Sequence, residues 1–185
     1  MAKQRGLSFY RRKKKIGSAI FREIISYILG IAIAVFLGIV IIYFWGMSTK
    51  VIGDSMNPEL SNGNITLISK AAYSMGSPRR GDVVAFKPNG NESSHYYVKR
   101  IVALPGETIE VIDGKIQVNG REIKERYKTT EIEELGLLSE PVTLRNNEYF
   151  VLGDDRLSSE DSRSADIGAV KRSEIDGKVW FVVSP

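Results

Sequence analysis

One long uncharged segment constrains the fold of this chain more than any other feature. No Asp, Glu, Lys or Arg occurs from Ile24 to Met47, where Ile, Leu, Val, Phe and Ala dominate. At ~1.5 Å per residue, a helix of this length spans the ~30 Å hydrocarbon core of a bilayer. Tyr27 and Trp45 lie near its two ends, as is typical of membrane interfaces. The segment is long for a removable signal peptide, so we expect a retained transmembrane helix over 24–47; a buried core helix is the alternative.

The basic residues of the chain are concentrated before this segment. Residues 1–23 carry a net charge of +7, whereas the whole chain carries +4, so the remainder is mildly acidic at −3. Because basic flanks stay in the cytoplasm, we expect a cytoplasmic segment 1–23 and an extracytoplasmic domain over 48–185. A nucleic-acid-binding domain carries positive charge on its folded surface. We therefore expect no nucleic-acid partner.

The scarcity of Cys and His excludes several kinds of site. The chain has no cysteine and one histidine, His95. Disulfides, a thiol nucleophile and thiolate zinc sites are excluded, as is a site with several histidines. His95 lies in the polar segment 89–95, which is typical of a solvated surface residue. We expect no metal and no cofactor.

The remainder of the chain, of a length that suits about one domain, has the pattern of short strands. The segments rich in β-branched or aromatic residues and bounded by turn residues are Ile65–Ser69, Val83–Phe86, Tyr96–Leu104, Thr108–Ile112, Lys115–Val118, Tyr149–Leu152 and Gly177–Val183. Asp113-Gly114 and Asn119-Gly120 predict two-residue hairpin turns, which need positive φ. The acidic stretch 122–138 lacks clear turn signals, and we expect it to be a peripheral insertion.

Three polar segments carry side chains suited to chemistry. Residues 53–58 (Gly-Asp-Ser-Met-Asn-Pro) place Ser55 shortly after the apolar segment, and residues 97–100 (Tyr-Val-Lys-Arg) place Lys99 in a strand. Residues 153–163 combine Gly-Asp-Asp-Arg with a run rich in Ser, Asp and Arg. Taken singly, the first is an ordinary polar turn and the third a hydrogen-bonded loop.

Lys99 is the most informative of these residues. Side chains alternate along a strand, so Lys99 shares a face with Tyr97, Ile101 and Ala103, which are mostly apolar. Burial lowers the pKa of a lysine, and moving it from ~10.4 to ~7 costs roughly 4–5 kcal/mol. An edge-strand lysine that points to solvent is the alternative, whereas a lysine that is truly buried indicates function.

In this order, the segments resemble the conserved boxes of bacterial type I signal peptidases. The matching segments are Ser-Met-x-Pro (55–58), Gly-Asp-Val-Val-Ala-Phe (81–86), Tyr-Val-Lys-Arg (97–100), Leu-Pro-Gly-Glu (104–107) and Gly-Asp-Asp-Arg…Asp-Ser-Arg (153–163). The resemblance extends from about residue 20 to the C-terminus and is to the compact Gram-positive form. It implies a mainly β fold, with an antiparallel sheet or partly open barrel and an active site near the membrane surface.

The resemblance also implies an activity and partners. The implied enzyme is a membrane-bound serine endopeptidase that removes N-terminal signal peptides from secreted precursors, outside the cytoplasm and without a cofactor. Its partners would be the signal peptides of exported precursors and the lipid bilayer, near the secretion translocon.

The resemblance assigns roles residue by residue. Ser55 matches the nucleophile, and Lys99 matches the general base that a weakly nucleophilic hydroxyl needs. Ser159 matches the serine whose hydroxyl orients the lysine amine. The residues that match a supporting ionic framework are Asp161, Arg163 and Arg100. The residues expected to flank an extended substrate or to line its shallow apolar pockets are Ile52, Gly53, Met56, Leu60, Tyr97 and Val98.

Several positions depart from the family pattern without removing a catalytic group. The substituted residues are Glu59 where Thr is usual, Ala103 where Gly is common, Asp155 for Asn and Glu107 for Asp. Some members have a serine two residues before the nucleophile, whose hydroxyl assists the oxyanion hole. Gly53 occupies that position here, so we expect only backbone donors, including the Ser55 N–H.

Two other functions fit part of the pattern. The SOS-repressor family uses a similar Ser/Lys peptidase domain to cut itself, but those proteins are cytoplasmic and carry a DNA-binding domain. Inactive signal-peptidase-like proteins that assist pilus polymerisation lack the catalytic residues, whereas Ser55 and Lys99 are both present here. A precursor-cleavage assay on membranes separates an enzyme from such an assembly factor.

Overall fold

The computed structural model describes residues 17–74, 76–91 and 93–183. The chain divides into two compact units, Met1–Ile42 and Tyr43–Pro185. The basic cluster of the predicted cytoplasmic segment, Arg11–Lys15, lies outside the described residues.

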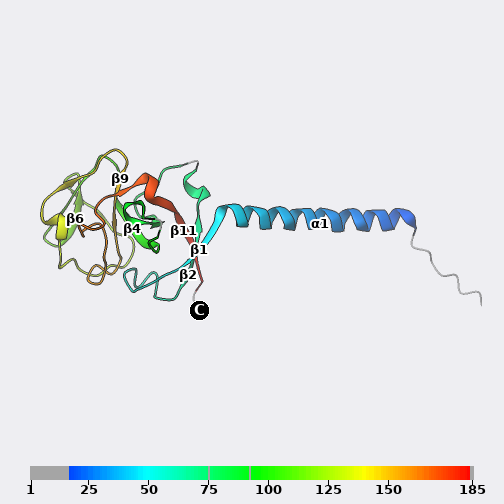
Figure 1. Ribbon diagram of the computed structural model, residues 1–185, viewed down its shortest axis with the longest axis horizontal. Coiled ribbons are helices and arrows are strands. Elements are labelled where there is room, and N and C mark those ends of the chain that lie inside the picture. The colour runs from blue at the N-terminus through cyan, green and yellow to red at the C-terminus, as the bar shows by residue number, and fades with distance from the viewer. Residues whose placement is uncertain (1–16, 75, 92, 184–185) are drawn as a thin grey trace, which may run out of the picture. The chain divides into compact units, whose positions relative to one another are not determined.

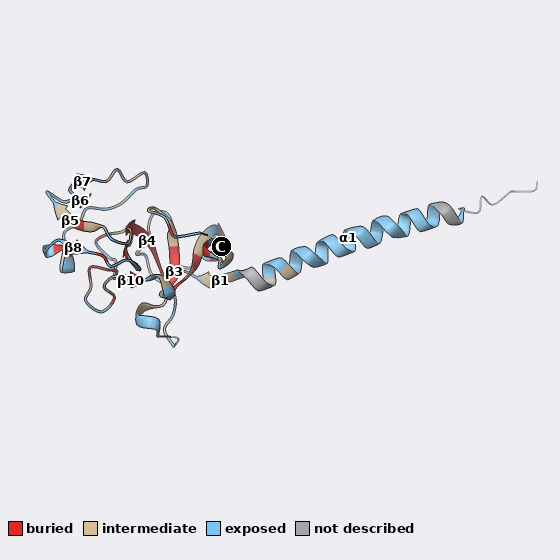
Figure 2. Cartoon of the chain, turned by 90° about the horizontal axis from the view of Figure 1, so that it is seen from above, coloured by how far each residue is buried: buried red, intermediate tan, exposed pale blue. Residues whose placement is uncertain are grey.

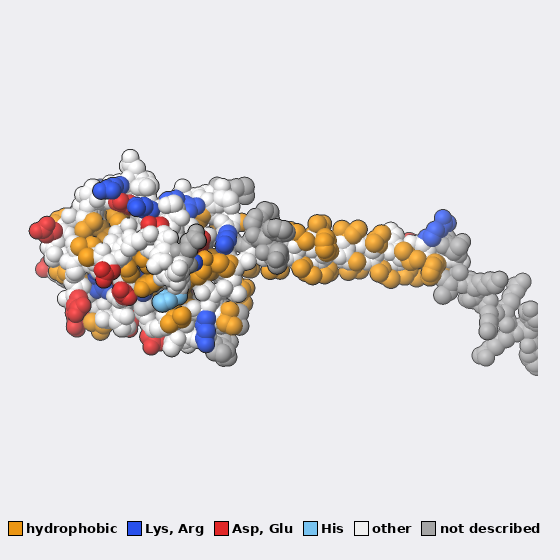
Figure 3. Space-filling model, in the orientation of Figure 1, with side chains coloured by type: hydrophobic (Ala, Val, Ile, Leu, Met, Phe, Trp, Pro, Cys, Tyr) orange, Lys and Arg blue, Asp and Glu red, His pale blue; other side chains and the backbone are white. Residues whose placement is uncertain are grey.

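The first unit contains all but the last three residues of the apolar helix α1 (Ser18–Trp45). Its stretch Ile20–Ile42 is long and apolar enough to cross a membrane, by length and composition. The side chains of that stretch are exposed (Figure 2), and hydrophobic groups cover the visible face of the helix (Figure 3). A helix that is apolar all round and not buried by its own protein does not fit the alternative of a core helix. The helix ends before the predicted boundary, because Gly46 and Met47 belong to a strand.

The second unit consists of short strands and single-turn helices. Within the described residues the strands are β1 (Gly46–Lys50), β2 (Ile65–Ser69), β3 (Val83–Phe86), β4 (Tyr97–Ala103), β5 (Thr108–Ile112), β6 (Lys115–Val118), β7 (Arg121–Glu122), β8 (Val142–Thr143), β9 (Glu148–Leu152), β10 (Val170–Lys171) and β11 (Ile175–Val183). The 3-10 helices are η1 (Ala71–Tyr73), η2 (Pro88–Gly90), η3 (Gly136–Ser139) and η4 (Arg172–Glu174). Every predicted strand is present; the short β1, β7, β8 and β10 were not predicted.

The strands form two antiparallel sheets (Figure 1). The larger has the order β1-β2-β11-β3-β4-β9-β10, and the smaller has the order β7-β6-β5-β8. All the described strand pairs within the two sheets are antiparallel. The larger sheet stays open, because its end strands β1 and β10 are not neighbours. These findings confirm the prediction of a mainly β fold with an antiparallel, partly open sheet.

The two predicted hairpin turns build the smaller sheet. Asp113 and Gly114 connect β5 to β6 with φ values of 50° and 73°, and Asn119 and Gly120 connect β6 to β7 with 52° and 68°. Positive φ at both central residues is the geometry that matches the twist of paired strands.

Three hydrophobic clusters fill the second unit and leave its central strands with little access to water. In β3, Val84 and Phe86 belong to one cluster, whereas Ala85 belongs to another, so both faces of the strand are covered. The third cluster joins the two sheets and contains Phe150 of β9 and Ile109 of β5. Strand β4, which carries Lys99, therefore lies in the most desolvated part of the fold (Figure 2).

Truncation of Phe150 tests this description of the core. Phe150 is fully buried, so Phe150→Ala is expected to lower the free energy of unfolding by about 3–5 kcal/mol through lost burial and a residual cavity. Phe181→Ala, at a side chain that is 53% exposed, is the matched control and is expected to change it by less than about 1 kcal/mol. The measurement is chemical unfolding of the full chain in detergent micelles. Equal losses in the two variants would contradict the assignment of the core.

Candidate active site

Strand β4 supplies two consecutive buried cations. Lys99 is 4% exposed and Arg100 is 6% exposed. Because side chains alternate along a strand, the two leave β4 on opposite faces, and Lys99 shares its face with Tyr97 and Ile101. A buried cation needs a polar partner, so each face of β4 must provide one.

Ser55 lies in a turn that the hydrophobic core holds from one side. The turn follows β1, and its Asn57 N–H donates to the Asp54 carbonyl at 2.9 Å. Met56 and Leu60 are 0% and 1% exposed and pack into the core with Val51 and Val98. Their apolar side chains stabilise the turn through this burial, and their expected role in substrate pockets stays a prediction.

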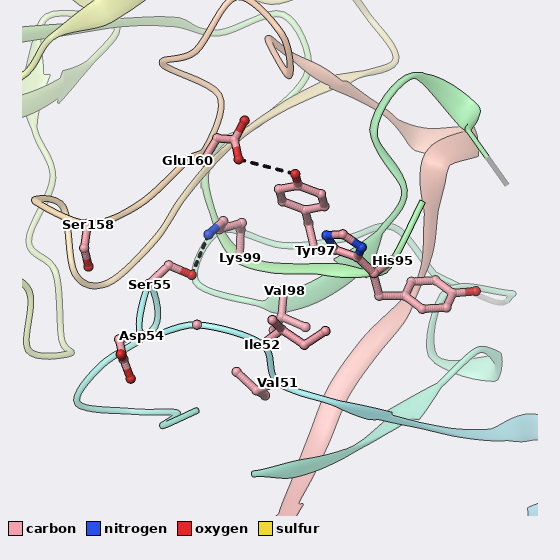
Figure 4. A pocket seen from close by; sticks show the side chains of 12 residues that line it. Val51, Ile52, Asp54, Ser55, His95, Tyr97, Val98, Lys99, Ser158 and Glu160 are labelled. Carbon is pink, nitrogen blue, oxygen red and sulfur yellow. Dashed lines mark hydrogen bonds between the residues drawn. The ribbon is translucent and has the colours of Figure 1, made fainter. Parts of the chain in front are cut away.

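The fold brings Ser55 and Lys99 into contact. Lys99 Nζ donates a hydrogen bond to Ser55 Oγ at 2.6 Å, across a sequence separation of 44 residues (Figure 4). The lysine comes from the middle of the sheet and the serine from the turn after β1. A nucleophile and a base within hydrogen-bonding reach are the arrangement that covalent catalysis requires.

Burial prepares Lys99 to act as a base. It lowers the pKa of Lys99 from 10.5 to about 8, and the carboxylates of Asp161 and Glu160 oppose the shift. Arg163 lowers this pKa further, and Asp154 raises it. The value stays above the ~7 considered in the sequence analysis, and the nearby carboxylates favour the ammonium form.

Asp161 organises the loop 153–163, which follows β9. Its fully buried carboxylate accepts a hydrogen bond from the Gly153 N–H at 3.1 Å and two from the Arg163 guanidinium at 2.8 and 3.0 Å. Arg163 also donates to the Arg156 carbonyl at 2.7 Å. A buried ion pair is tolerated when its remaining donors and acceptors are satisfied. Asp161 and Arg163 therefore fix the loop from within.

Gly153 allows three segments to meet behind the nucleophile. A Cβ at Gly153 would lie 2.2 Å from Ser159 Oγ and 2.4 Å from the Ser55 carbonyl oxygen, so no other residue fits. Ser159 Oγ is buried there and has no hydrogen-bond partner among the described residues. No bond joins Ser159 to Lys99 in this structure, and the role of Ser159 in orienting the amine stays a prediction.

Arg100 is paired with Asp154, which the sequence analysis did not assign. Its Nε and Nη2 atoms donate to the two carboxylate oxygens at 2.8 and 2.6 Å, and Nη1 donates to the Gly81 carbonyl at 3.0 Å. The ring of Tyr127 lies 4.0 Å from the guanidinium carbon. Such a bidentate pair restricts geometry as well as adding energy. The paired acids of Gly-Asp-Asp-Arg were the available signal for this partner.

The segment 122–138 is not peripheral, contrary to our expectation. Tyr127 covers Arg100, and Glu125 forms an ion pair with the buried Arg156. Arg156 Nε in turn donates to the Gly153 carbonyl at 2.9 Å. An acidic segment without clear turn signals predicts a peripheral position, because such a pattern shows no partner in the core. Its side chains serve instead as partners for buried arginines.

Thr130 connects the same segment to the nucleophile turn. Its Oγ1 accepts a hydrogen bond from the Arg156 N–H at 2.7 Å and donates to the Asp155 carboxylate at 3.1 Å. The Asp155 N–H donates to the Ser55 carbonyl at 3.1 Å. The hydrogen bond from Ser158 is the main cause of a lowered pKa at Asp155. Asp155 therefore remains an acceptor that holds this connection together.

A cleft beside the dyad is lined by four of the six expected substrate-binding residues, Ile52, Gly53, Tyr97 and Val98 (Figure 4). β4 pairs with β3 from Tyr97 onward, whereas its described pairing with β9 begins at Arg100. One backbone edge of residues 97–99 is therefore left without a neighbouring strand among the described residues. His95 is exposed, as expected, but it also lines the cleft and stacks on Tyr97 at 5.8 Å between ring centroids.

Two departures from the family pattern have a local explanation. Gly53 has φ of +87°, which a serine at this position would adopt only under strain. Glu107 pairs with Arg80 at 2.7 Å and accepts a hydrogen bond from the Leu104 N–H at 2.7 Å, so its longer side chain is fully used.

For metals, the described residues contain no group of three or more His, Cys, Asp or Glu that is arranged to hold an ion.

Removal of the Thr130 hydroxyl tests the support of the nucleophile turn. Thr130→Val leaves the Arg156 N–H and the Asp155 carboxylate without this partner, a loss of about 1 kcal/mol. We expect covalent labelling of Ser55 by a fluorophosphonate to slow about fivefold. Thr129→Val, one position earlier, is the control and is expected to label at the parent rate. The support is refuted if both variants label as fast as the parent.

Known proteins resemble this chain over most of its length. The family model described as "Signal peptidase, peptidase S26" matches residues 24–184. Signal peptidase I T of Bacillus subtilis (strain 168) is 36% identical over 162 residues, covering 84% of this chain and 82% of that protein. Signal peptidase I of Bacillus caldolyticus is 39% identical over 140 residues, covering 70% and 74%. A crystal structure of a signal peptidase I from Enterococcus faecalis V583 matches with 32% identity and a TM-score of 0.47, covering 58% of this chain and 100% of that one. The chain belongs to the signal peptidase family, peptidase S26.

Proposed function

We propose that this protein is a type I signal peptidase in which Ser55 is the nucleophile and Lys99 the general base. The observation that supports the proposal is the 2.6 Å hydrogen bond between Lys99 Nζ and Ser55 Oγ, made by a lysine that is only 4% exposed. Family membership supplies the reaction, hydrolysis of the bond that joins a signal peptide to an exported precursor. The Ser55–Lys99 dyad supplies the nucleophile and the base for that reaction.

In the first half of the reaction, neutral Lys99 takes the proton of the Ser55 hydroxyl as Oγ attacks the scissile carbonyl carbon. The oxyanion of the tetrahedral intermediate accepts a hydrogen bond from backbone donors, among them the Ser55 N–H. Each such preorganised donor is worth about 3–4 kcal/mol in related enzymes. The C–N bond then breaks, and Lys99 passes its extra proton to the leaving amine.

The second half returns the enzyme to its starting state. Neutral Lys99 removes a proton from a water molecule, whose oxygen attacks the carbonyl carbon of the acyl-enzyme. The ester bond to Ser55 breaks, and the proton held by Lys99 returns to Ser55 Oγ. The signal peptide leaves with a new carboxylate, and no metal or cofactor enters this scheme.

The substrate lies extended in the cleft and pairs with the backbone, in the manner of strand addition. The open edge of residues 97–99 offers donors and acceptors on one side, and residues 51–53 flank the other side. Ile52 and Val98 line the same cleft and suit shallow apolar pockets for small substrate side chains. Met56 and Leu60 pack against Val51 and Val98 and support the turn from the core side.

Membrane association follows from the family and from the apolar helix α1. We place α1 across the bilayer as a single span, because the basic residues of segment 1–23 favour the cytoplasmic side. The catalytic unit is then extracytoplasmic and anchored beside the lipid. Precursors reach that side during export, so the enzyme would meet its signal peptides near the secretion translocon.

Substitution of the dyad tests the proposed function. Ser55→Ala and Lys99→Ala are each expected to reduce cleavage of an exported precursor by about 1,000-fold or more, since the two groups act as a unit. Lys99→Arg is expected to be as inactive, because a guanidinium cannot supply a neutral base. Ser93→Ala and Lys115→Ala, in exposed positions, are controls expected to cleave at the parent rate. Full cleavage by a folded Ser55→Ala variant would show that the dyad is misassigned.

The pH dependence tests the neutral-lysine mechanism. Because burial lowers the pKa of Lys99 to about 8, the protonated fraction grows as pH falls below this value. We expect kcat/KM to fall about tenfold per pH unit on the acid side. A flat profile between pH 5 and 9 contradicts a neutral lysine base.

The same pKa shift predicts a change in stability with pH. Between pH 8 and 10.5 the unfolded chain binds the Lys99 proton and the folded chain does not, so stability rises with pH in this window. We expect the stability of the parent relative to Lys99→Met to rise there and to be level below it. Chemical unfolding of both proteins at several pH values measures the difference without relying on activity.

A further inference from the structure

A bridge between Tyr97 and Glu160 closes one side of the cleft beside the dyad. The Tyr97 O–H donates to the Glu160 carboxylate at 3.3 Å and joins β4 to the loop 153–163 (Figure 4). Both residues line the cleft, as does Lys99. This hydrogen bond therefore holds the Glu160 carboxylate beside the cleft, next to the strand that carries Lys99.

Two aromatic side chains contact the ring of Tyr97. Its ring stacks on His95 at 5.8 Å and packs against Phe86 at 6.0 Å between centroids. Burial and the charge of Glu160 raise the pKa of the Tyr97 hydroxyl, so it stays protonated and donates throughout the physiological range. A fixed ring with a permanent donor gives the exposed carboxylate of Glu160 a defined position.

The other charges that face Lys99 are already engaged. Asp161 is paired with Arg163, and Asp154 is paired with Arg100. Among the described residues, no Lys or Arg side chain forms an ion pair with Glu160. The charged and titratable groups around Lys99 are Asp154, Glu160, Asp161 and Arg163 from the loop, Asp54 from the nucleophile turn, and His95 and Tyr97 from the β4 side. Glu160 is the carboxylate of this loop group whose charge no cation neutralises.

We propose that Glu160, anchored by the Tyr97 hydroxyl, is a positioning residue that favours the ammonium form of Lys99 and so sets the lower pH limit of cleavage. The carboxylate opposes the desolvation that makes Lys99 a base, and it does so through space without touching the substrate carbonyl. The inference rests on the proposed function, because it concerns the protonation of the base in that reaction. Glu160 thus influences the pH range of cleavage from outside the Ser55–Lys99 dyad.

Three variants separate charge from structure. Glu160→Gln keeps an acceptor for the Tyr97 hydroxyl and removes only the charge, so the acid limb of kcat/KM is expected to move down by about 0.5 pH unit. Cleavage at pH 6, relative to the alkaline plateau of the same variant, then rises about threefold. Tyr97→Phe keeps the ring and the charge but frees the carboxylate, so a smaller downward shift is expected. Glu140→Gln, at an exposed position, controls for net charge and is expected to match the parent.

The measurement is the pH profile of kcat/KM for a precursor, with the full chain in detergent micelles at low and high salt. An exposed charge is screened by salt, so the shift is expected to shrink as ionic strength rises. A Glu160→Gln limb that coincides with the parent limb, or a fall of the plateau without a shift of the limb, overturns the inference. If the parent shows no acid limb, or Lys99→Ala remains active, the proposed function itself has failed.

Discussion

The site depends on keeping one amine away from water without leaving it unpartnered. Lys99 comes from a central strand that is covered on both faces, which is where desolvation favours the neutral base. Its partner is a hydroxyl at 2.6 Å, and the carboxylates that raise its pKa most, Asp161, Glu160 and Asp154, belong to a single loop. If that loop moved closer, the pKa of Lys99 would rise and still less of the neutral base would be present at neutral pH. If it moved away, the fold would carry an uncompensated buried amine.

Several contacts from different elements therefore fix the position of the loop 153–163. Asp161 ties its first residue, Gly153, to its last, Arg163. Arg100 binds Asp154 and lies on β4, the strand that also carries Lys99, so the loop is attached to the strand of the base. Segment 122–138 adds the outer contacts to Arg100, Arg156 and Asp155. Arg100 thus limits independent motion of the loop and of the strand that carries Lys99.

The sequence predicts the strands better than it predicts the contacts between loops. Periodicity and turn chemistry located every major strand, and they failed for β1, β7, β8 and β10, which are too short or too polar to show a pattern. Ser55 and Lys99 were reached through the order of motifs. For Met56 and Leu60 the sequence does not separate the two possibilities, because an apolar residue beside a nucleophile suits a pocket wall and a core equally well. Asp154, Tyr127 and Thr130 escaped notice because long-range pairing of buried arginines leaves no local signal.

Under the proposed function, the open edge of β4 would let one shallow cleft accept peptides of different sequence. Backbone donors and acceptors are the same in every peptide, so pairing along residues 97–99 provides affinity without reading sequence. Selection then falls to the few side chains that meet the substrate close to Ser55, where a small pocket excludes by size. Such a division requires the substrate to be extended at the bond that is cut. The fold suits such a substrate, because Lys99 and the open edge of residues 97–99 lie on one continuous strand.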